Sequence, residues 1–254
     1  MSNPAPDTVV LVSDTHFRLE ETAADSPRLA RFLAFLEACR GVDSLVLLGD
    51  IFDFWFDYPH FRLRGYDDLL DALDALHRAG TRIEFVGGNH DIWAAAFLHR
   101  RYGSDPEGRP LHLEQGGRRI VLDHGDGLLA RDYLYKTFRW IVRRRAGILL
   151  AKSLHPELLY AFSRWLSGTS RRATRHEAGE IERLARLYLA RAPRDWDLKI
   201  IGHLHLPLQV RLGEQELAVL GCWLGGEEGY AVLRGGRVAL CDFRRDPSPR
   251  AVTV

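Results

Sequence analysis

The sequence has few cysteines and no long apolar run, and both shortages restrict the kind of protein that it can encode. Its three cysteines, Cys39, Cys222 and Cys241, are widely spaced and form no paired motif, which argues against a disulfide framework or a thiolate metal site. Apolar stretches such as residues 8–12 fall far short of the ~20 residues that a membrane span needs. The polar, proline-containing residues 1–8 do not have the pattern of a secretory signal. We therefore expect a soluble protein of the reducing cytoplasm.

Net charge is also nearly absent, but the charges are unevenly distributed. The 254 residues include 35 Lys and Arg against 34 Asp and Glu, a formal charge of +1. Residues 131–190 contain 13 basic and 5 acidic side chains, a balance of +8, whereas the rest of the chain has 22 and 29, a balance of −7. An acidic body with a basic insert indicates that the body binds cations and that the insert meets an anionic partner.

The first half of the chain has the pattern of an α/β protein, and its length suits one compact domain with an insertion. Three short apolar runs predict buried strands at residues 8–12, 45–48 and 83–86. A helix with Ser26 as N-cap and Pro27 at its first position should end before Gly41, and a second amphipathic helix should end at Gly80. A β-α-β-α-β order predicts parallel strands joined by right-handed crossovers.

The second half of the body is rich in short strands. Residues 119–122 and 198–201 predict two strands, and each is followed at once by a histidine-bearing turn. Four more short strands are expected near residues 209–212, 217–220, 230–233 and 238–241. We expect these four to form a second, antiparallel sheet. Two sheets packed face to face, with helices outside, would make an α/β sandwich.

Residues 131–190 interrupt this pattern with a long, mostly helical stretch. It holds eight of the 26 aromatic residues, and Gly147, Pro156 and Gly168 divide it into about three helices. An ordinary helical subdomain with the aromatic residues in its core is one explanation. The combined excess of aromatic residues and positive charge favours a cap over a binding site.

Chemistry-bearing residues gather in turns that follow the predicted strands. There are five such segments: Asp14-Thr15-His16, Gly49-Asp50-Ile51-Phe52-Asp53, Gly88-Asn89-His90-Asp91, Asp123-His124-Gly125-Asp126 and Gly202-His203-Leu204-His205. Each alone could be a surface turn. Because ligands bind at the carboxyl ends of strands in α/β sheets, five such turns in this order predict one shared site.

The residue types in these turns are those of a metal site. Carboxylate, amide oxygen and imidazole ligands without thiolate suit Mn²⁺, Fe²⁺, Zn²⁺ or Mg²⁺. A shared carboxylate can bridge two ions ~3.5–4 Å apart, and Asp50 is the candidate bridge. Glycines beside the proposed ligands let the backbone turn sharply toward an ion. We expect two divalent ions, with Mn²⁺ as the first choice.

The ordered motif set from Asp14 to His205 resembles the calcineurin-like metallophosphoesterase superfamily. The resemblance implies a four-layer α/β sandwich of two mixed sheets flanked by helices, and hydrolysis of a phosphate ester or anhydride. It also implies that one ion is held by Asp14, His16, Asp50 and His205. The other would be held by Asp50, Asn89, His124 and His203. His90, steadied by Asp53, would be the catalytic residue that faces the phosphate and protonates or stabilises the leaving oxygen.

Details around these motifs resemble the UDP-2,3-diacylglucosamine diphosphatases of lipid A synthesis. The shared segments include Phe52-Asp53-Phe54-Trp55, Gly88-Asn89-His90-Asp91-Ile92-Trp93, His124-Gly125-Asp126-Gly127-Leu128, Leu154-His155-Pro156 and Gly202-His203-Leu204-His205-Leu206-Pro207. The best-known branch of that family has Arg in place of His90, so this chain resembles the His-bearing branch. The resemblance implies that the substrate is split into UMP and 2,3-diacylglucosamine 1-phosphate.

In that family a helical insertion clasps the acyl chains, so residues 131–190 would be the cap of a single domain spanning residues 1–254. Its expected substrate-binding residues are Trp140, Arg143, Ser170, Arg171 and Arg172. A solvated helix end is the alternative for the last three. The expected partners are an anionic lipid-linked or nucleotide-linked phosphate and the inner membrane surface, with the protein cytoplasmic or peripheral on that membrane. We expect no nucleic acid and no obligate protein partner.

Two other functions fit parts of the pattern. A phosphodiesterase or nuclease could use Arg143-Arg144-Arg145 and Arg171-Arg172 to bind phosphates, with salt-dependent affinity. The apolar residues Ile141, Val142 and 148–150 that flank the first run favour a lipid interface instead. A scaffold that lost its chemistry should lack some ligands or His90, and this chain lacks none.

Overall fold

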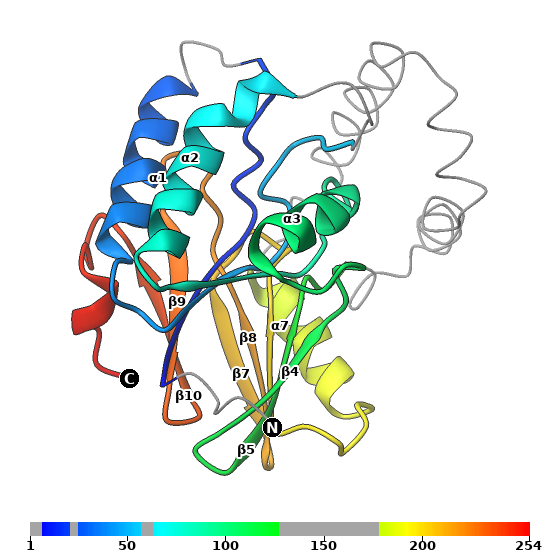
Figure 1. Ribbon diagram of the computed structural model, residues 1–254. Helices are drawn as coiled ribbons and strands as arrows, with labels where there is room; N and C mark the ends of the chain where they lie inside the picture. The colour runs from blue at the N-terminus through cyan, green and yellow to red at the C-terminus, as the bar shows by residue number, and fades with distance from the viewer. Residues whose placement is uncertain (1–6, 21–24, 57–62, 127–177) are drawn as a thin grey trace.

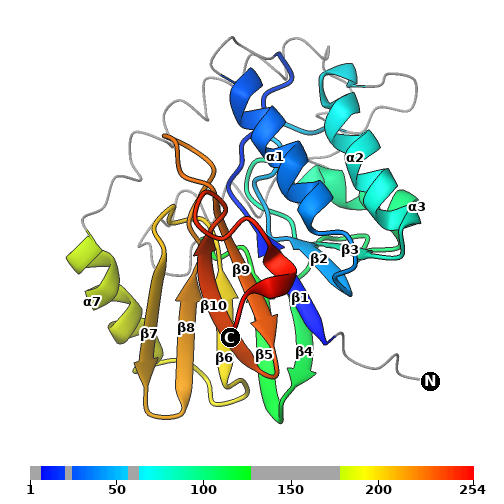
Figure 2. The ribbon, with the colours of Figure 1, turned by 90° about the vertical axis from the view of Figure 1, so that its left-hand side faces the viewer.

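The computed structural model describes residues 7–20, 25–56, 63–126 and 178–254, and these form an α/β sandwich (Figure 1). Two five-stranded sheets lie face to face, and helices cover the outer face of each. Figure 2 shows α1, α2 and α3 together near β1 to β3, and α7 beside β7. The expected four-layer fold with two mixed sheets is confirmed.

The first sheet has the strand order β10-β9-β1-β2-β3. Its strands are β1 (Thr8–Val12), β2 (Ser44–Leu47), β3 (Arg82–Phe85), β9 (Gly229–Arg234) and β10 (Arg237–Asp242). The pairs β1-β2 and β2-β3 are parallel, and β9 joins both β1 and β10 in antiparallel pairs. The three N-terminal strands therefore point their carboxyl ends to one edge.

The second sheet has the strand order β4-β5-β6-β8-β7. Its strands are β4 (Leu111–Gln115), β5 (Arg118–Asp123), β6 (Leu198–Ile201), β7 (Leu208–Leu212) and β8 (Gln215–Val219). The pairs β5-β6 and β6-β8 are parallel, whereas β4-β5 and β7-β8 are antiparallel. The expectation that the last four strands form one antiparallel sheet is therefore wrong, because β9 and β10 extend the first sheet instead.

Helices α1 (Ser26–Ala38), α2 (Asp67–Arg78) and α3 (Ala95–Tyr102) pack on the outer face of the first sheet (Figure 1). Three short 3₁₀ helices, Arg64–Tyr66, Ile92–Ala94 and Pro249–Ala251, complete the described helices of this part. The N-cap of α1 is Asp25 and not Ser26, which corrects the sequence expectation. The Asp25 carboxylate accepts a hydrogen bond from Arg28 instead of capping a backbone N–H.

Successive side chains of β1 pack into two different hydrophobic cores. Val10 and Val12 face the helices, whereas Val9 and Leu11 face the second sheet, and all four side chains are fully buried. A strand points successive side chains to opposite faces, so an all-apolar run fits a strand covered on both sides. This double burial fixes the strand end that carries Asp14.

The fourth layer is α7 (Ala178–Leu189), which packs on the outer face of the second sheet. Its buried residues Ile181, Ala185 and Leu189 recur at helical spacing and contact Trp196 and strand residues. None of the helices that the structure describes is long and apolar enough to cross a bilayer. Of the predicted cap at residues 131–190, residues 178–189 form α7 and pack on the second sheet, and residues 131–177 lie outside the described residues.

Candidate metal centre

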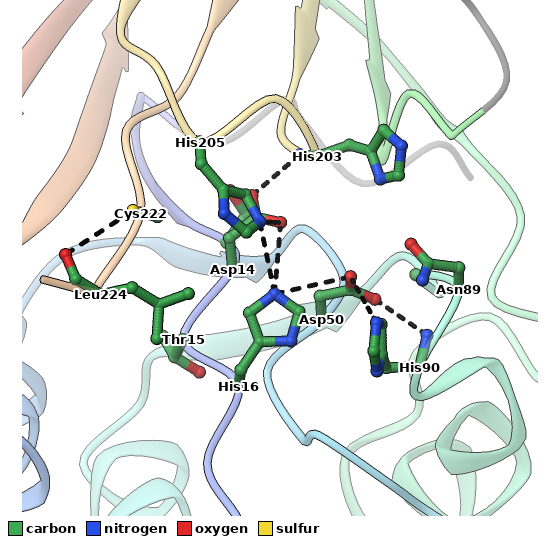
Figure 3. A network of polar contacts seen from close by, with 12 residues as sticks. Asp14, Thr15, His16, Asp50, Asn89, His90, His203, His205, Cys222 and Leu224 are labelled. Carbon is green, nitrogen blue, oxygen red and sulfur yellow. Dashed lines mark hydrogen bonds and ion pairs between the residues drawn. The ribbon is translucent and has the colours of Figure 1, made fainter. Parts of the chain in front are cut away.

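The seven predicted metal ligands lie together where strands of both sheets end. Figure 3 labels all of them except His124. Asp14 and His16 follow β1, Asp50 follows β2 and Asn89 follows β3. From the other sheet, His124 follows β5, and His203 and His205 follow β6. Because β1-β2-β3 and β5-β6 are parallel sets, their carboxyl ends deliver these side chains to one edge of the sandwich.

Backbone strain marks the same residues. In the described ranges five non-glycine residues have positive φ, and all are predicted ligands: Asp14 (54°), His16 (45°), Asp50 (55°), His203 (68°) and His205 (55°). A side-chain-bearing residue adopts this left-handed region at an energetic cost. Such strain collects at sites where the direction of a side chain matters more than local stability.

The two carboxylate oxygens of Asp14 have different surroundings. Its Oδ2 atom accepts hydrogen bonds from the Ser13 hydroxyl at 2.7 Å and from the His203 backbone N–H at 2.8 Å. Its Oδ1 atom is buried and accepts no hydrogen bond, and it lies 3.2 Å from Nε2 of His205 and 4.0 Å from Nε2 of His16. A buried carboxylate oxygen without a donor is costly, and a cation would satisfy it.

Asp50 lies between two groups of imidazoles. Its Oδ1 atom accepts the backbone N–H of His90 at 3.0 Å. Its Oδ2 atom lies 3.4 Å from Nε2 of His124 on one side and 3.8 Å from Nε2 of His16 on the other. The carboxylate is thus within reach of both groups, as a bridging ligand requires.

His124 is oriented by a hydrogen bond on the far side of its ring. Its Nδ1–H donates to the backbone carbonyl of Leu48 at 2.9 Å, which leaves Nε2 directed into the site. That Nε2 atom lies 3.3 Å from Oδ1 of Asn89. The ring centroid of His203 is 5.1 Å away. This group therefore offers imidazole, amide and carboxylate ligands to one position.

These contacts fit divalent metal ions. Three groups have ligand atoms within 4.8 Å of one another: Asp14 with His16 and His205, Asp50 with His124 and His203, and His16 with Asp50 and His90. The first two contain three of the four residues of each predicted coordination set, and the sets themselves stay a prediction. The nitrogen and oxygen ligands suit Mn²⁺, Fe²⁺, Zn²⁺ or Mg²⁺.

Comparison with known protein families shows to which family the chain belongs. The calcineurin-like phosphoesterase family matches residues 8–207. The chain belongs to this family. A UDP-2,3-diacylglucosamine hydrolase of Ectopseudomonas mendocina is 30% identical over 88% of this chain and 93% of its own length. A protein of the same name from Porphyromonas gingivalis is 29% identical over 91% of this chain and 96% of its own.

Among solved structures, a dimetal phosphatase from Danio rerio aligns with 93% of this chain and 96% of its own, at 18% identity and a TM-score of 0.47. Membership in the calcineurin-like phosphoesterase family, together with the His and Asp groups, establishes the chain as a metal-dependent phosphoesterase and supports divalent metal ions as its cofactors. The identity of the ions stays a prediction.

Electrostatics in this phosphoesterase keeps the two central carboxyl groups ionised. Burial acts to raise the pKa of Asp14, but the close contact with His205 and its charge outweigh burial and hold the pKa below its usual range. Burial acts in the same direction on Asp50, where the charges of His124 and His90 lower the pKa further than burial raises it. Two buried, ionised carboxylates in one site attract cations strongly.

The histidines divide into two pairs. Burial lowers the pKa of His16, and burial together with the charge of His124 lowers the pKa of His203 to about 4. Both rings are therefore neutral, the state that binds metals. For His124 and His205, burial acts to lower the pKa, but Asp50 and Asp14 respectively outweigh it and raise the pKa. Metal binding should displace protons from these two rings.

His90 and Asp53 lie beside the first group. The His90 Nδ1–H donates to the backbone carbonyl of Asp53 at 3.1 Å, and the same Nδ1 lies 3.6 Å from Oδ1 of that residue. Asp53 Oδ1 is equally distant, at 3.6 Å, from Nδ1 of His16. Asp53 is therefore placed to orient a predicted metal ligand as well as the predicted catalytic histidine, a double role that the sequence did not suggest.

Asp91 is a functional residue whose role the sequence analysis missed. It is fully buried, and its carboxylate accepts four backbone N–H groups, from Gly88, Asp50, Ile51 and Phe52, at 2.7 to 3.2 Å. The carboxylate thus joins the turn of Asp50 to its own turn, which carries Asn89 and His90. Its position at the end of the Gly88-Asn89-His90-Asp91 motif was the available signal. The predicted substrate-binding residues Trp140, Arg143, Ser170, Arg171 and Arg172 lie outside the described residues.

Proposed function

We propose that this phosphoesterase hydrolyses the pyrophosphate of UDP-2,3-diacylglucosamine and releases UMP and 2,3-diacylglucosamine 1-phosphate. The observation that carries the proposal is the position of Asp50 Oδ2 between the His16 and His124 groups, which suits two-metal hydrolysis. The substrate follows from relatives of that name, which are about 30% identical over nearly their whole length. We further propose Mn²⁺ as the ion and peripheral contact with the inner membrane.

The proposed ligand sets use every predicted ligand. Asp14, His16, Asp50 and His205 would hold one ion. Asp50, Asn89, His124 and His203 would hold the other. When bound, two divalent ions acidify the attacking water and withdraw charge from the phosphate. The protein contributes the ligand positions, which the strained backbone, Ser13, Leu48 and Asp91 maintain through their hydrogen bonds.

His90 is the proposed general acid for the leaving phosphate oxygen. The hydrogen bond from Nδ1 to the Asp53 carbonyl fixes the ring, so Nε2 is the nitrogen that faces the site. Nε2 of His90 is 3.9 Å from Asp50 Oδ2. Its backbone N–H holds Asp50 Oδ1, so the acid and the bridging carboxylate share one rigid turn.

The basic insert is the proposed binding region for the lipid half of the substrate. Trp140 and Arg143 would contact the acyl chains and the charged head, and Ser170, Arg171 and Arg172 the polar sugar region. The support is the +8 balance and the seven aromatic residues of residues 131–177, since Tyr188 packs on Trp196 in the body. Truncating Trp140 should raise KM for the diacylated substrate more than KM for a small aryl phosphate.

A substrate panel tests the proposed function. The Mn²⁺-loaded protein is incubated separately with UDP-2,3-diacylglucosamine, a simple UDP-sugar, an aryl phosphodiester and single-stranded DNA. We expect UMP release to be fastest from the diacylated substrate, with no turnover after chelation. Preferential cleavage of the simple diester or of DNA, weakening steeply with salt, would instead support the alternative of a phosphodiesterase or nuclease.

A further inference from the structure

A pocket of about 450 Å³ opens beside the first ligand group. His16 forms part of its wall, the start of α1 forms another part, and the loop of residues 223–228 closes it. Figure 3 shows Leu224, from that loop, on the opposite side of His16 from Asn89. The volume is within the ~300–1,000 Å³ of pockets that bind small molecules.

Six of the twelve residues that line the pocket have charged side chains, and Pro27, Trp223 and Leu224 add apolar surface. Arginines 18, 28 and 31 and the carboxylates of Asp25, Glu227 and Glu228 all contribute to the wall. Burying alkyl chains against such groups would remove their water without replacing its hydrogen bonds. A flat polar molecule that offers both donors and acceptors can pair with these charged groups and also contact the apolar part of the wall.

Arg18 is the arginine that is best placed to bind a ligand. Arg31 donates to both oxygens of Glu228, at 3.0 and 2.7 Å, and Arg28 donates to Asp25 and to the backbone carbonyl of Thr15. Within the described residues Arg18 makes one ion pair, with 3.6 Å between its NH1 atom and Oδ2 of Asp25, and its side chain is 41% exposed. A contact of that length leaves guanidinium donors for another acceptor.

The opposite wall offers acceptors and room for a flat group. Glu227 is exposed, and Gly225 and Gly226 have no side chain and face open space. Their positive φ values of 65° and 86° explain why glycine occupies both positions. The backbone and the Glu227 carboxylate are therefore accessible from the pocket.

The two ends of the metal centre differ in what adjoins them. Asp126 follows His124 by two residues and is the last described residue before the basic insert, so the chain enters the insert from the His124 end of the site. The pocket lies at the other end, beside His16. A substrate whose pyrophosphate spans the centre would place one half at each end.

We propose that this pocket is the uridine subsite, with Arg18 donating to acceptor oxygens of the nucleoside and Glu227 accepting from its N–H or hydroxyl groups. This inference rests on the proposed function, which supplies a substrate with one polar and one lipid half. Uracil has two carbonyl acceptors beside one N–H donor, and ribose adds two hydroxyls. The pocket supplies the complementary groups, and the insert end is left for the lipid half.

The test compares Arg18→Ala and Glu227→Gln with the wild type and with a matched control. Arg40→Ala is the control because Arg40 is also on the surface, 47% exposed and ion-paired with Glu37 at 2.6 Å. Binding of UMP to the Mn²⁺-loaded protein is measured by calorimetry, and metal content is checked for each variant. Kinetics are measured with UDP-2,3-diacylglucosamine and with an aryl phosphodiester, which has no nucleoside.

Arg18→Ala should weaken UMP binding and raise KM for the UDP substrate by roughly tenfold or more, the effect of losing one charge-assisted hydrogen bond. The ratio of kcat/KM between the UDP substrate and the diester should fall by the same factor, and Glu227→Gln should change it in the same direction. Arg40→Ala should match the wild type. Unchanged UMP binding in Arg18→Ala, or equal losses on both substrates, would overturn the subsite.

Failure of the proposed function gives a different result. If the wild type releases no UMP from the diacylated substrate, that function is wrong. UMP binding alone then decides the pocket, since a loss of affinity in Arg18→Ala supports a uridine subsite and equal affinity rejects it.

Discussion

Oδ1 of Asp91 accepts the backbone N–H of Asp50 at 3.1 Å, which ties together two turns that are 41 residues apart in the sequence. Each oxygen of Asp91 accepts two N–H groups. The amide of Asn has only one acceptor oxygen, so Asp91→Asn would leave two buried N–H groups unsatisfied in either orientation. We expect metal affinity to fall roughly 10- to 100-fold, as for other residues that orient metal ligands. Metal titration of the apo-protein measures this.

Asp105→Asn is the matched control for that variant. Asp105 also accepts two backbone N–H groups, from Glu107 and Arg109, but both belong to its own surface turn. That turn contacts Gly87 through the backbone of Gly108 and not through the Asp105 side chain. Asp105→Asn should bind metal like the wild type. Wild-type metal affinity in Asp91→Asn would show that the hydrogen bonds to Asp91 do not position Asp50.

Gly49→Ala should damage the site through a steric clash. A Cβ atom at this position would lie 2.5 Å from Nδ1 of His124 and 2.7 Å from the backbone nitrogen of Gly88, and φ is +81°. His124 would have to leave its hydrogen bond to Leu48, so we expect loss of activity and of bound metal. Metal analysis and turnover of an aryl phosphodiester measure both effects.

Gly103→Ala is the control that separates the effect of the steric clash at Gly49 from the effect of backbone strain. Gly103 has nearly the same φ, +80°, and a Cβ there would meet no atom within 4 Å. It should cost about 1–2 kcal/mol of stability for the left-handed conformation and leave metal content normal. If both variants lose metal equally, strain and not the contact with His124 is the cause.

Asp50 and His90 should respond differently to substitution, because one is a proposed ligand of both ions and the other a proposed acid. Asp50→Ala should lower the metal content from about two ions per chain toward none. His90→Asn should keep its metals and slow turnover roughly 10²- to 10⁴-fold, the usual contribution of a general acid. Metal analysis beside kcat tests the pair, and loss of metal in His90→Asn would make His90 a ligand.

Asp197 predicts how stability changes in acid. Hydrogen bonds from the Arg119 side chain and backbone lower the pKa of Asp197 from 3.8 to about 2. The unfolded chain binds the proton first as the pH falls, so the stabilisation is complete above pH ~4 and is lost toward pH 2. Urea unfolding should show Asp197→Asn less stable than the wild type at pH 7. The difference should be small, because Arg119 is 53% exposed, and should shrink between pH 4 and pH 2.

The sequence predicted the strands and the converging turns well, because both depend on local patterns. The apolar run of β1 followed by Asp14 indicates a doubly buried strand with a ligand at its end. A local pattern does not indicate to which sheet a strand belongs. Strands β7 to β10 all look like hairpin strands, yet β9 pairs with β1, more than 200 residues away in the sequence. That pairing depends on the whole fold.

Two elements, α3 and β4, had no prediction. The alternating, half-polar β4 has only partly buried side chains facing inward, which gives a weak strand signal. At the site, the motifs identified Asp50 and His90 but not the Asp91 hydrogen bonds that join their two turns. Hydrogen bonds such as those of Asp91 depend on where distant backbone N–H groups converge, and a sequence pattern does not specify that. The left-handed conformations of the ligands are likewise visible only in three dimensions.

Hydrolysis of UDP-2,3-diacylglucosamine in ¹⁸O-enriched water, with the Mn²⁺-loaded protein, tests the central claim most directly. With the uridine half in the pocket beside His16 and the lipid half toward the insert, water should attack the uridine-side phosphorus. His90 should protonate the departing lipid phosphate. Mass spectrometry should find one ¹⁸O atom in UMP and none in 2,3-diacylglucosamine 1-phosphate. Label in the lipid product would reverse the orientation of the substrate, and no release of UMP would contradict the account.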